Sequence, residues 1–180
     1  MTAIALTFGL AACGGDNAAP TSTPDASAPP ASDITLVSKK ANYTSLLVPS
    51  DFDEFYDKDG NGIAEGPNSN ILITNTFETD VRIEDITEDY MIGLMENSYT
   101  NIEVLAFENP ASIAGVDAVL IQFTGDGATS NKNRTVCYVM MLFSIDGLNC
   151  EQHVAFTYDT GANTSLEANL IDILKSITLE

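Results

Sequence analysis

The 180-residue sequence contains one histidine, no tryptophan, three cysteines and only seven lysine and arginine residues. A single imidazole, that of His153, excludes metal sites that need two histidines, which include most zinc and copper sites. The seven cations stand against 26 aspartate and glutamate residues, and the formal net charge of −19 repels phosphate backbones. We therefore expect no nucleic-acid partner and no attachment to anionic lipid through basic residues.

The sequence also lacks an apolar run of the roughly 20 residues that a membrane-spanning helix needs. Its hydrophobic content of 44% is nevertheless sufficient for a buried core, so the composition is not that of a disordered acidic chain. The composition changes near residue 34 and shows no second break. We therefore expect a single folded domain over residues 35–180.

The amino end has the composition of a leader. Residues 2–12 are small or apolar and are followed by a cysteine, in the sequence Leu10-Ala11-Ala12-Cys13. Such a stretch has the length of a secretory signal and is too short to span a membrane. It resembles the lipobox of bacterial lipoproteins, which implies a signal peptide over residues 1–12 and a diacylglycerol thioether on Cys13. No Lys or Arg precedes it, so we expect the natural leader to begin upstream of Met1; the alternative is an apolar tail that ends in a cysteine by chance.

Residues 13–34 are rich in Ala, Pro, Ser and Thr, and no large apolar side chain occurs between Gly14 and Asp33. Burial cannot offset the entropy of ordering such a segment, so we expect a flexible tether. A flexible chain of about 20 residues has an end-to-end distance near 25 Å. The leader, the cysteine and the tether together predict a domain held by lipid at the extracytoplasmic face of the cell membrane.

Hydrophobic periodicity predicts six strands and two helices in the rest of the chain. We expect strands over 42–48, 70–77, 101–107, 115–124, 134–144 and 149–158, a loop over 51–68, and helices over 85–99 and 164–176. Each helix has a capping box, Asp85 with Glu88 and Thr164 with Glu167, and Asp146-Gly147 predicts a hairpin. This order predicts an α+β fold, an antiparallel sheet of about six strands with helices packed on its faces.

The same order is similar to the PsbP-like family, whose bacterial members include DcrB-type lipoproteins. The resemblance covers residues 42–180 and rests on core positions and turn glycines. The segments that carry it are Val48-Pro49-Ser50-Asp51-Phe52, Asn70-Ile71-Leu72-Ile73, the helix with Tyr90 and Leu94, Ile113-Ala114-Gly115, Leu142–Gly147 and Ile173–Ile177. It implies a small binding or assembly-factor domain without shared catalytic residues.

The segment that begins Asp57-Lys58-Asp59-Gly60-Asn61-Gly62 resembles the start of an EF-hand calcium loop. Asp57, Asp59 and Asn61 stand at the first three ligand positions, and Gly62 stands where the loop turns sharply. Position 12 is Asn68, which cannot supply the bidentate carboxylate that completes the shell. We expect calcium to bind weakly if at all, and no other cofactor; the alternative is an ordinary turn between two strands.

The same region is dense in carboxylates, and paired carboxylates are the machinery of glycoside hydrolysis. The candidates are Asp51, Asp53, Glu54, Asp57 and Asp59. Such pairs need an enclosed site that separates their pKa values, and a polar loop does not indicate one. A divergent hydrolase that uses the acidic residues of segment 51–65 is therefore our alternative functional hypothesis.

The remaining cysteines and the histidine offer little chemistry. A hairpin at Asp146-Gly147 places Cys150 opposite Phe143, far along the strand from Cys137, so we expect these cysteines not to be bonded to each other. We expect His153 to lie at the surface, on the opposite strand face from Cys150. The leading hypothesis is a lipid-anchored binding or accessory protein without catalysis, whose protein or small-molecule partner the sequence does not identify.

Overall fold

The computed structural model describes residues 34–180, so the expected signal peptide, Cys13 and the tether up to residue 33 lie outside it. Its strands are β1 (Leu36–Ala41), β2 (Thr44–Pro49), β3 (Tyr56–Lys58), β4 (Asn61–Gly66), β5 (Ser69–Ile73), β6 (Phe77–Glu78), β7 (Tyr99–Ile113), β8 (Val116–Gly127), β9 (Asn133–Ile145), β10 (Leu148–Asp159) and β11 (Thr178–Leu179). Its helices are the 3-10 turn η1 (Ile83–Asp85), α1 (Glu88–Met95) and α2 (Ser165–Ser176). None of the described helices has the length and apolar character required to cross a membrane.

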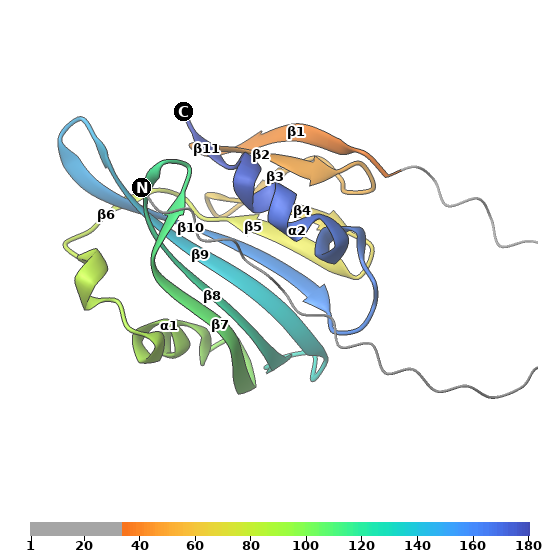
Figure 1. Cartoon of the computed structure of the whole chain (residues 1–180). Helices are drawn as coiled ribbons and strands as arrows, with labels where there is room; N and C mark the ends of the chain where they lie inside the picture. The colour runs from red at the N-terminus through yellow and green to blue at the C-terminus, as the bar shows by residue number, and fades with distance from the viewer. Residues whose placement is uncertain (1–33) are drawn as a thin grey trace, which may run out of the picture. The chain divides into compact units, whose positions relative to one another are not determined.

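The strands form two antiparallel sheets (Figure 1). The larger has the order β3-β4-β5-β10-β9-β8-β7, and β6 pairs with β10 beyond the end of β5. The smaller has the order β1-β2-β11. The α+β fold with helices on the faces of an antiparallel sheet is confirmed, but the larger sheet has eight strands, more than the six expected.

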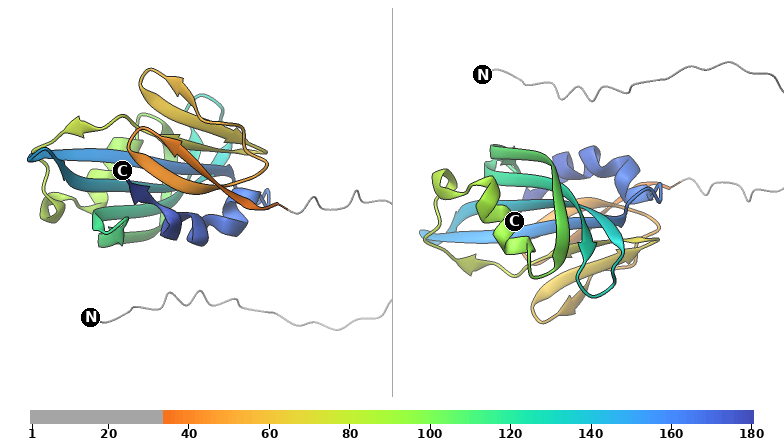
Figure 2. Two further views of the ribbon diagram at one scale, coloured as in Figure 1. Left: turned by 90° about the horizontal axis from the view of Figure 1, so that it is seen from above. Right: turned by 90° about the horizontal axis from the view of Figure 1, so that it is seen from below.

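A hydrophobic core lies on each face of the larger sheet. Seen from above, α2 and the β1–β2 hairpin lie over one face (Figure 2, left), where Leu166, Leu170 and Ile173 of α2 are buried. Seen from below, α1 lies on the other side (Figure 2, right), where Met91 and Met95 are buried. Strand β9 contributes to both cores, which explains its nearly continuous apolar sequence.

Two helix caps differ in how well the sequence predicts them. Thr164 caps α2 as expected, because its side chain accepts a hydrogen bond from the Glu167 amide at 3.1 Å. The predicted cap at Asp85 is wrong: α1 begins three residues later and is capped by Thr87, which accepts from the Tyr90 amide. The helix is correspondingly short, and Tyr99 belongs to β7.

The region before residue 69 contains more strands than expected. The predicted strand 42–48 is β2, and a separate strand β1 precedes it through a turn at Asn42, whose φ is +52°. The predicted loop over 51–68 is wrong as well, because it contains the β3–β4 hairpin. Its turn is Asp59-Gly60, with φ values of +56° and +83°, the same dipeptide that makes the β9–β10 turn at Asp146-Gly147.

Candidate functional site

The three proposed calcium ligands lie in the β3–β4 hairpin, and the side-chain oxygens of two of them accept hydrogen bonds. The Asp57 carboxylate accepts from the Gly60 amide at 3.4 Å, and the Asn61 side chain accepts from the Asn75 amide at 3.2 Å. Asp59 supplies the turn itself. Within residues 34–180, no three His, Cys, Asp or Glu side chains are grouped so that they could hold a metal ion. Calcium binding at this hairpin stays a prediction.

Gly62 has a different role from the one predicted. It does not make a sharp turn, because it lies in β4 and is buried there. A Cβ atom on Gly62 would lie 2.4 Å from the Cβ atom of Ala41, at the end of β1. The glycine is therefore required by the close approach of the β1–β2 hairpin to β4.

The carboxylates of segment 51–65 point to different neighbours. Asp51 accepts a hydrogen bond from the Ser165 hydroxyl at the start of α2, at 2.8 Å. The Lys39 ammonium, 7% exposed as a side chain, donates to the carbonyls of Phe52 and Asp53 and to the Glu54 carboxylate at 2.9–3.0 Å. The Glu54 side chain is 87% exposed. These carboxylates hold the loop to β1 and α2 and do not form the enclosed pair that the hydrolase hypothesis requires.

The two cysteines of the folded region are free and buried. The predicted register is confirmed: Cys150 pairs with Phe143, whereas Cys137 pairs with Phe156 further along β10. Burial raises the pKa of the Cys137 thiol to about 12, so this thiol stays protonated and unreactive near neutral pH.

The prediction that His153 lies at the surface is wrong. Its side chain is on the face of β10 that carries the α1 core, and the residue is only 9% exposed. The Tyr138 hydroxyl lies 2.5 Å from His153 Nδ1, and the Glu151 carboxylate lies 3.3 Å from Nε2. The Phe77 ring of β6 packs edge-on at 5.6 Å between centroids. We call Tyr138, Glu151 and His153 the buried polar cluster.

The buried polar cluster has the order carboxylate, imidazole, hydroxyl, which in an open site can activate a nucleophile. Here burial lowers the pKa of His153, although Glu151 partly opposes this shift. Burial also raises the pKa of the Tyr138 hydroxyl, which is the opposite of activation. The cluster is consistent with the Nε2–H tautomer of a neutral imidazole, which we assign from the single hydrogen bond of the ring, donated by Tyr138 to Nδ1. It ties β9 to β10 next to the Phe77 ring.

Two adjoining depressions lie at the β9–β10 hairpin end of the sheet. Their volumes are about 290 and 320 Å³, and they share Thr79 and Asn149 in their walls. We call them together the hairpin groove. The first is lined by Thr79, Val81, Arg82, Ile83, Glu84, Asp117, Leu142, Phe143, Asn149 and Cys150, and the second by Glu78, Thr79, Asp80, Gly147, Leu148 and Asn149.

The local structure follows from the segment that crosses this end of the sheet. Strand β6 pairs with β10, and the Thr79 amide continues the pairing by donating to the Asn149 carbonyl at 3.0 Å. The Asn109 side chain then holds the 3-10 turn, since it donates to the carbonyls of Ile83 and Ile86. Between these two attachments, apolar Val81 and Ile83 alternate with charged residues.

The hairpin groove has a mixed polar and apolar lining and an acidic character. Val81, Ile83, Leu142 and Phe143 are each partly buried, whereas Leu148 at the hairpin is 51% exposed. Four exposed carboxylates line it together with one cation, Arg82, which lies 4.0 Å from one of them. These carboxylates are those of Glu78, Asp80, Glu84 and Asp117.

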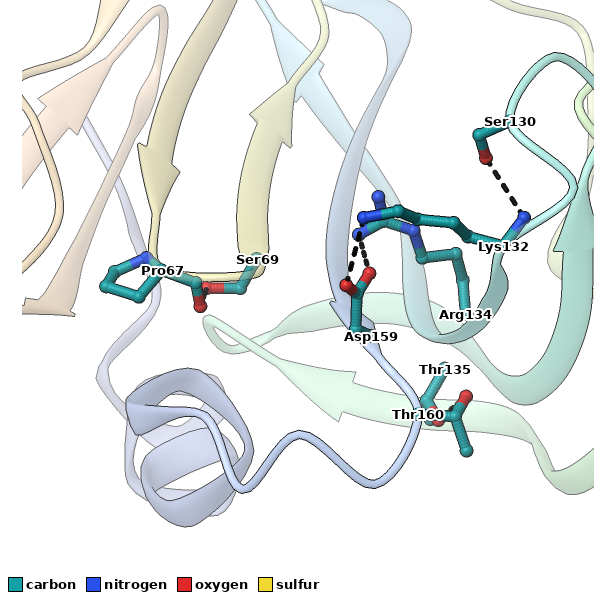
Figure 3. Close-up of polar contacts among 8 residues, drawn as sticks. All are labelled: Pro67, Ser69, Ser130, Lys132, Arg134, Thr135, Asp159 and Thr160. Atoms are coloured by element: carbon teal, nitrogen blue, oxygen red, sulfur yellow. Dashed lines mark hydrogen bonds and ion pairs between the residues drawn. The ribbon is translucent and has the colours of Figure 1, made fainter.

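Two basic side chains, those of Lys132 just before β9 and Arg134 near its start (Figure 3), lie at the end of the strand opposite the groove. Lys132 and Arg134 both pair with Asp159, at 3.4 and 2.5 Å, next to the Thr135 and Thr160 hydroxyls, which lie 3.0 Å apart. The length of β9 separates them from Leu142 and Phe143 of the groove by roughly 25–35 Å at about 3.3 Å per residue. Because exposed charges are screened beyond about 8 Å at physiological salt, these cations do not neutralise the groove.

Neither the hairpin groove nor the buried polar cluster is predicted from the sequence. A usable signal existed for the groove: residues 78–89 contain six carboxylates and one arginine, with apolar residues between them. No comparable signal marked the cluster, because Tyr138 and His153 come together only through the pairing of β9 with β10.

No protein-family model matches the chain, and no curated protein does either. Solved structures do match. LpqN, involved in cell envelope biogenesis of Mycobacterium tuberculosis, is 14% identical with a TM-score of 0.57, over 82% of this chain and 92% of LpqN. The Ran-binding protein Mog1p of Saccharomyces cerevisiae is 10% identical with a TM-score of 0.51, over 81% of this chain and 96% of Mog1p. At these identities the likeness concerns the fold alone, and a PsbP-like fold fits it.

Proposed function

We propose that this chain is a lipid-anchored protein of the extracytoplasmic face of the cell membrane that binds a partner as an accessory protein and catalyses no reaction. The observation that carries the proposal is the sequence Leu10-Ala11-Ala12-Cys13, which a polar segment joins to a folded unit. The proposal includes the division into a leader (residues 1–12), a lipidated tether (13–34) and one folded domain (35–180).

Three observations support a binding role. The hairpin groove combines apolar and charged side chains at one end of the sheet, as protein-binding surfaces do. The buried polar cluster contains a hydroxyl whose pKa is raised, which favours a structural role over a nucleophilic one. LpqN, which shares the fold, is involved in cell envelope biogenesis, and Mog1p binds Ran, so the fold accommodates roles in the envelope and in protein binding.

The hydrolase alternative receives less support. It depends on carboxylates that converge in an enclosed site, and Asp51 and Glu54 instead contact α2 and β1. None of the carboxylates of segment 51–65 lines the hairpin groove.

The lipid anchor is tested by the variant Cys13→Ser in the natural host, with membrane fractionation and metabolic labelling by a radioactive fatty acid. We expect the wild type to carry label and to sediment with membranes, because two or more acyl chains anchor a protein stably. The variant should lose the label and leave the membrane fraction. Ser22→Ala, in the expected tether, is the matched control and should behave as the wild type. Retention of Cys13→Ser in the membrane fraction without any fatty-acid label would contradict the proposal.

A further inference from the structure

We infer that the hairpin groove receives a basic, amphipathic segment of a partner protein, with its cationic side chains at the groove carboxylates and an apolar side chain over Val81 and Ile83. This inference deepens the proposed function and rests on it. The basic and amphipathic character of the partner segment follows from the shape, the apolar residues and the charge of the hairpin groove.

The size of the groove favours a peptide segment over a compact small molecule. Pockets that enclose drug-sized ligands have volumes of about 300–1,000 Å³ and bury most of the ligand. The two depressions here are at the lower limit, about 290 and 320 Å³. Both are lined by Thr79 and Asn149, whose backbones are hydrogen-bonded to each other. Two small neighbouring depressions suit successive side chains of an extended or helical segment.

The apolar part of the groove supplies a place for an anchoring side chain. Val81 and Ile83 come from the crossing segment and, like Leu142 of β9, pack against the α1 core, whereas Phe143 packs against the α2 core. Leu148 lines the second depression, on the hairpin, and is 51% exposed. Buried apolar anchors inside a polar rim are the usual source of binding energy at protein interfaces.

The negative charge of the groove favours a partner segment of positive charge. Glu78, Asp80, Glu84 and Asp117 are exposed around it, and Arg82 is the single cation in its lining. Lys132 and Arg134 lie at the far end of β9, beyond the screening length. An acidic surface steers and orients a cationic partner, and it repels an acidic one.

The test is fluorescence anisotropy with three labelled 12-residue peptides, one that alternates Lys with Leu, one that alternates Glu with Leu and one that alternates Lys with Ser. The protein is the full chain, purified in detergent from whichever cell fraction contains it, so that the result does not depend on the anchor. Binding in this assay together with a failed anchoring experiment would leave the groove assignment intact and overturn only the localisation.

We expect the Lys-Leu peptide to bind best, and its affinity to fall when NaCl is raised from 50 to 200 mM. The double variant E78Q/D80N should weaken it by about twofold to tenfold, since each exposed ion pair contributes a small factor. The control E103Q/D172N removes two exposed carboxylates outside the groove lining, on β7 and α2. It should leave the affinity nearly unchanged.

Three outcomes would overturn the inference. Equal weakening by the groove variant and by E103Q/D172N would show that only net charge matters. Equal binding of the Lys-Ser peptide would show that the apolar lining plays no part. Unchanged affinity in both E78Q/D80N and Leu148→Ser, with folding confirmed by circular dichroism, would place the peptide elsewhere.

Discussion

Replacing Gly62 by alanine tests whether this glycine serves close packing or a calcium loop. The new methyl group would lie 2.4 Å from the Ala41 Cβ. Carbon atoms in good contact are about 3.5 Å apart, so one of the two strands has to move by about 1 Å. Both positions are buried. Overpacking of this kind lowers the free energy of unfolding by about 1–3 kcal/mol.

A second substitution isolates the clash. Ala41→Gly removes the opposing methyl group and costs about 1–2 kcal/mol by itself, from lost burial and from the greater freedom of glycine. If the two changes were independent, their costs would add. Because the clash disappears in the double variant, we expect G62A with A41G to be within about 1 kcal/mol of A41G alone.

The assay is urea unfolding of the wild type, the two single variants and the double variant, each with millimolar calcium and with a chelator. If Gly62 serves close packing, each substitution should lower the free energy of unfolding by the same amount with calcium and with chelator. A calcium loop predicts a stabilisation by calcium that is lost in G62A and in the control D57A/D59A, with no rescue by A41G. Absence of rescue, or a cost of G62A that appears only with calcium, would refute our account of Gly62.

Three further predictions concern stability. Burial raises the folded-state pKa of Cys137 from about 9 to about 12, so the unfolded state loses the thiol proton first as pH rises. Above pH 9 the wild type should therefore lose up to about 1.4 kcal/mol of unfolding free energy per pH unit relative to Cys137→Ala. Parallel profiles of the urea midpoint against pH for the two proteins would contradict this. Burial lowers the pKa of His153, so the unfolded state takes up the proton first on acidification. The wild type should therefore lose stability relative to His153→Gln as pH falls below about 6.5. Identical slopes of unfolding free energy against pH in the two proteins would show that the imidazole is not held neutral. Lys39→Met should cost about 2 kcal/mol, because the partly buried Phe52 carbonyl and its neighbour lose a charged donor; an unchanged melting temperature would remove Lys39 as the anchor of the 51–54 loop.

The sequence predicted those elements whose signals are local. Asp146-Gly147 lies between two long apolar runs, and its hairpin and register follow from turn geometry. Thr164 precedes an amphipathic stripe, and its cap forms as expected. The equivalent dipeptide Asp59-Gly60 lies in the segment that the sequence predicts as a loop, with an ordinary turn or a weak calcium site as alternatives, because its flanking residues are polar and its strands are short.

The features missed are those that depend on contacts between distant segments. A glycine is needed at position 62 because the Ala41 side chain lies close to it. His153 is buried by the Phe77 ring and by Tyr138 of the neighbouring strand β9. The groove forms because residues 79–84 cross the ends of three later strands. Periodicity reports which face of an element is apolar, but it does not report which distant segment will cover that face.

The most direct test of the central claim, that the chain is an envelope-anchored protein that binds a partner through the hairpin groove, is photo-crosslinking in intact cells. A photoreactive amino acid is placed at Leu148 in the groove or at Ile171 on α2; these positions are 51% and 50% exposed, so they are matched controls for each other. We predict a crosslinked product at Leu148 that maps to a lysine- or arginine-rich segment of an envelope protein and that disappears with E78Q/D80N. Equal products from both positions, or none from Leu148, would contradict the account.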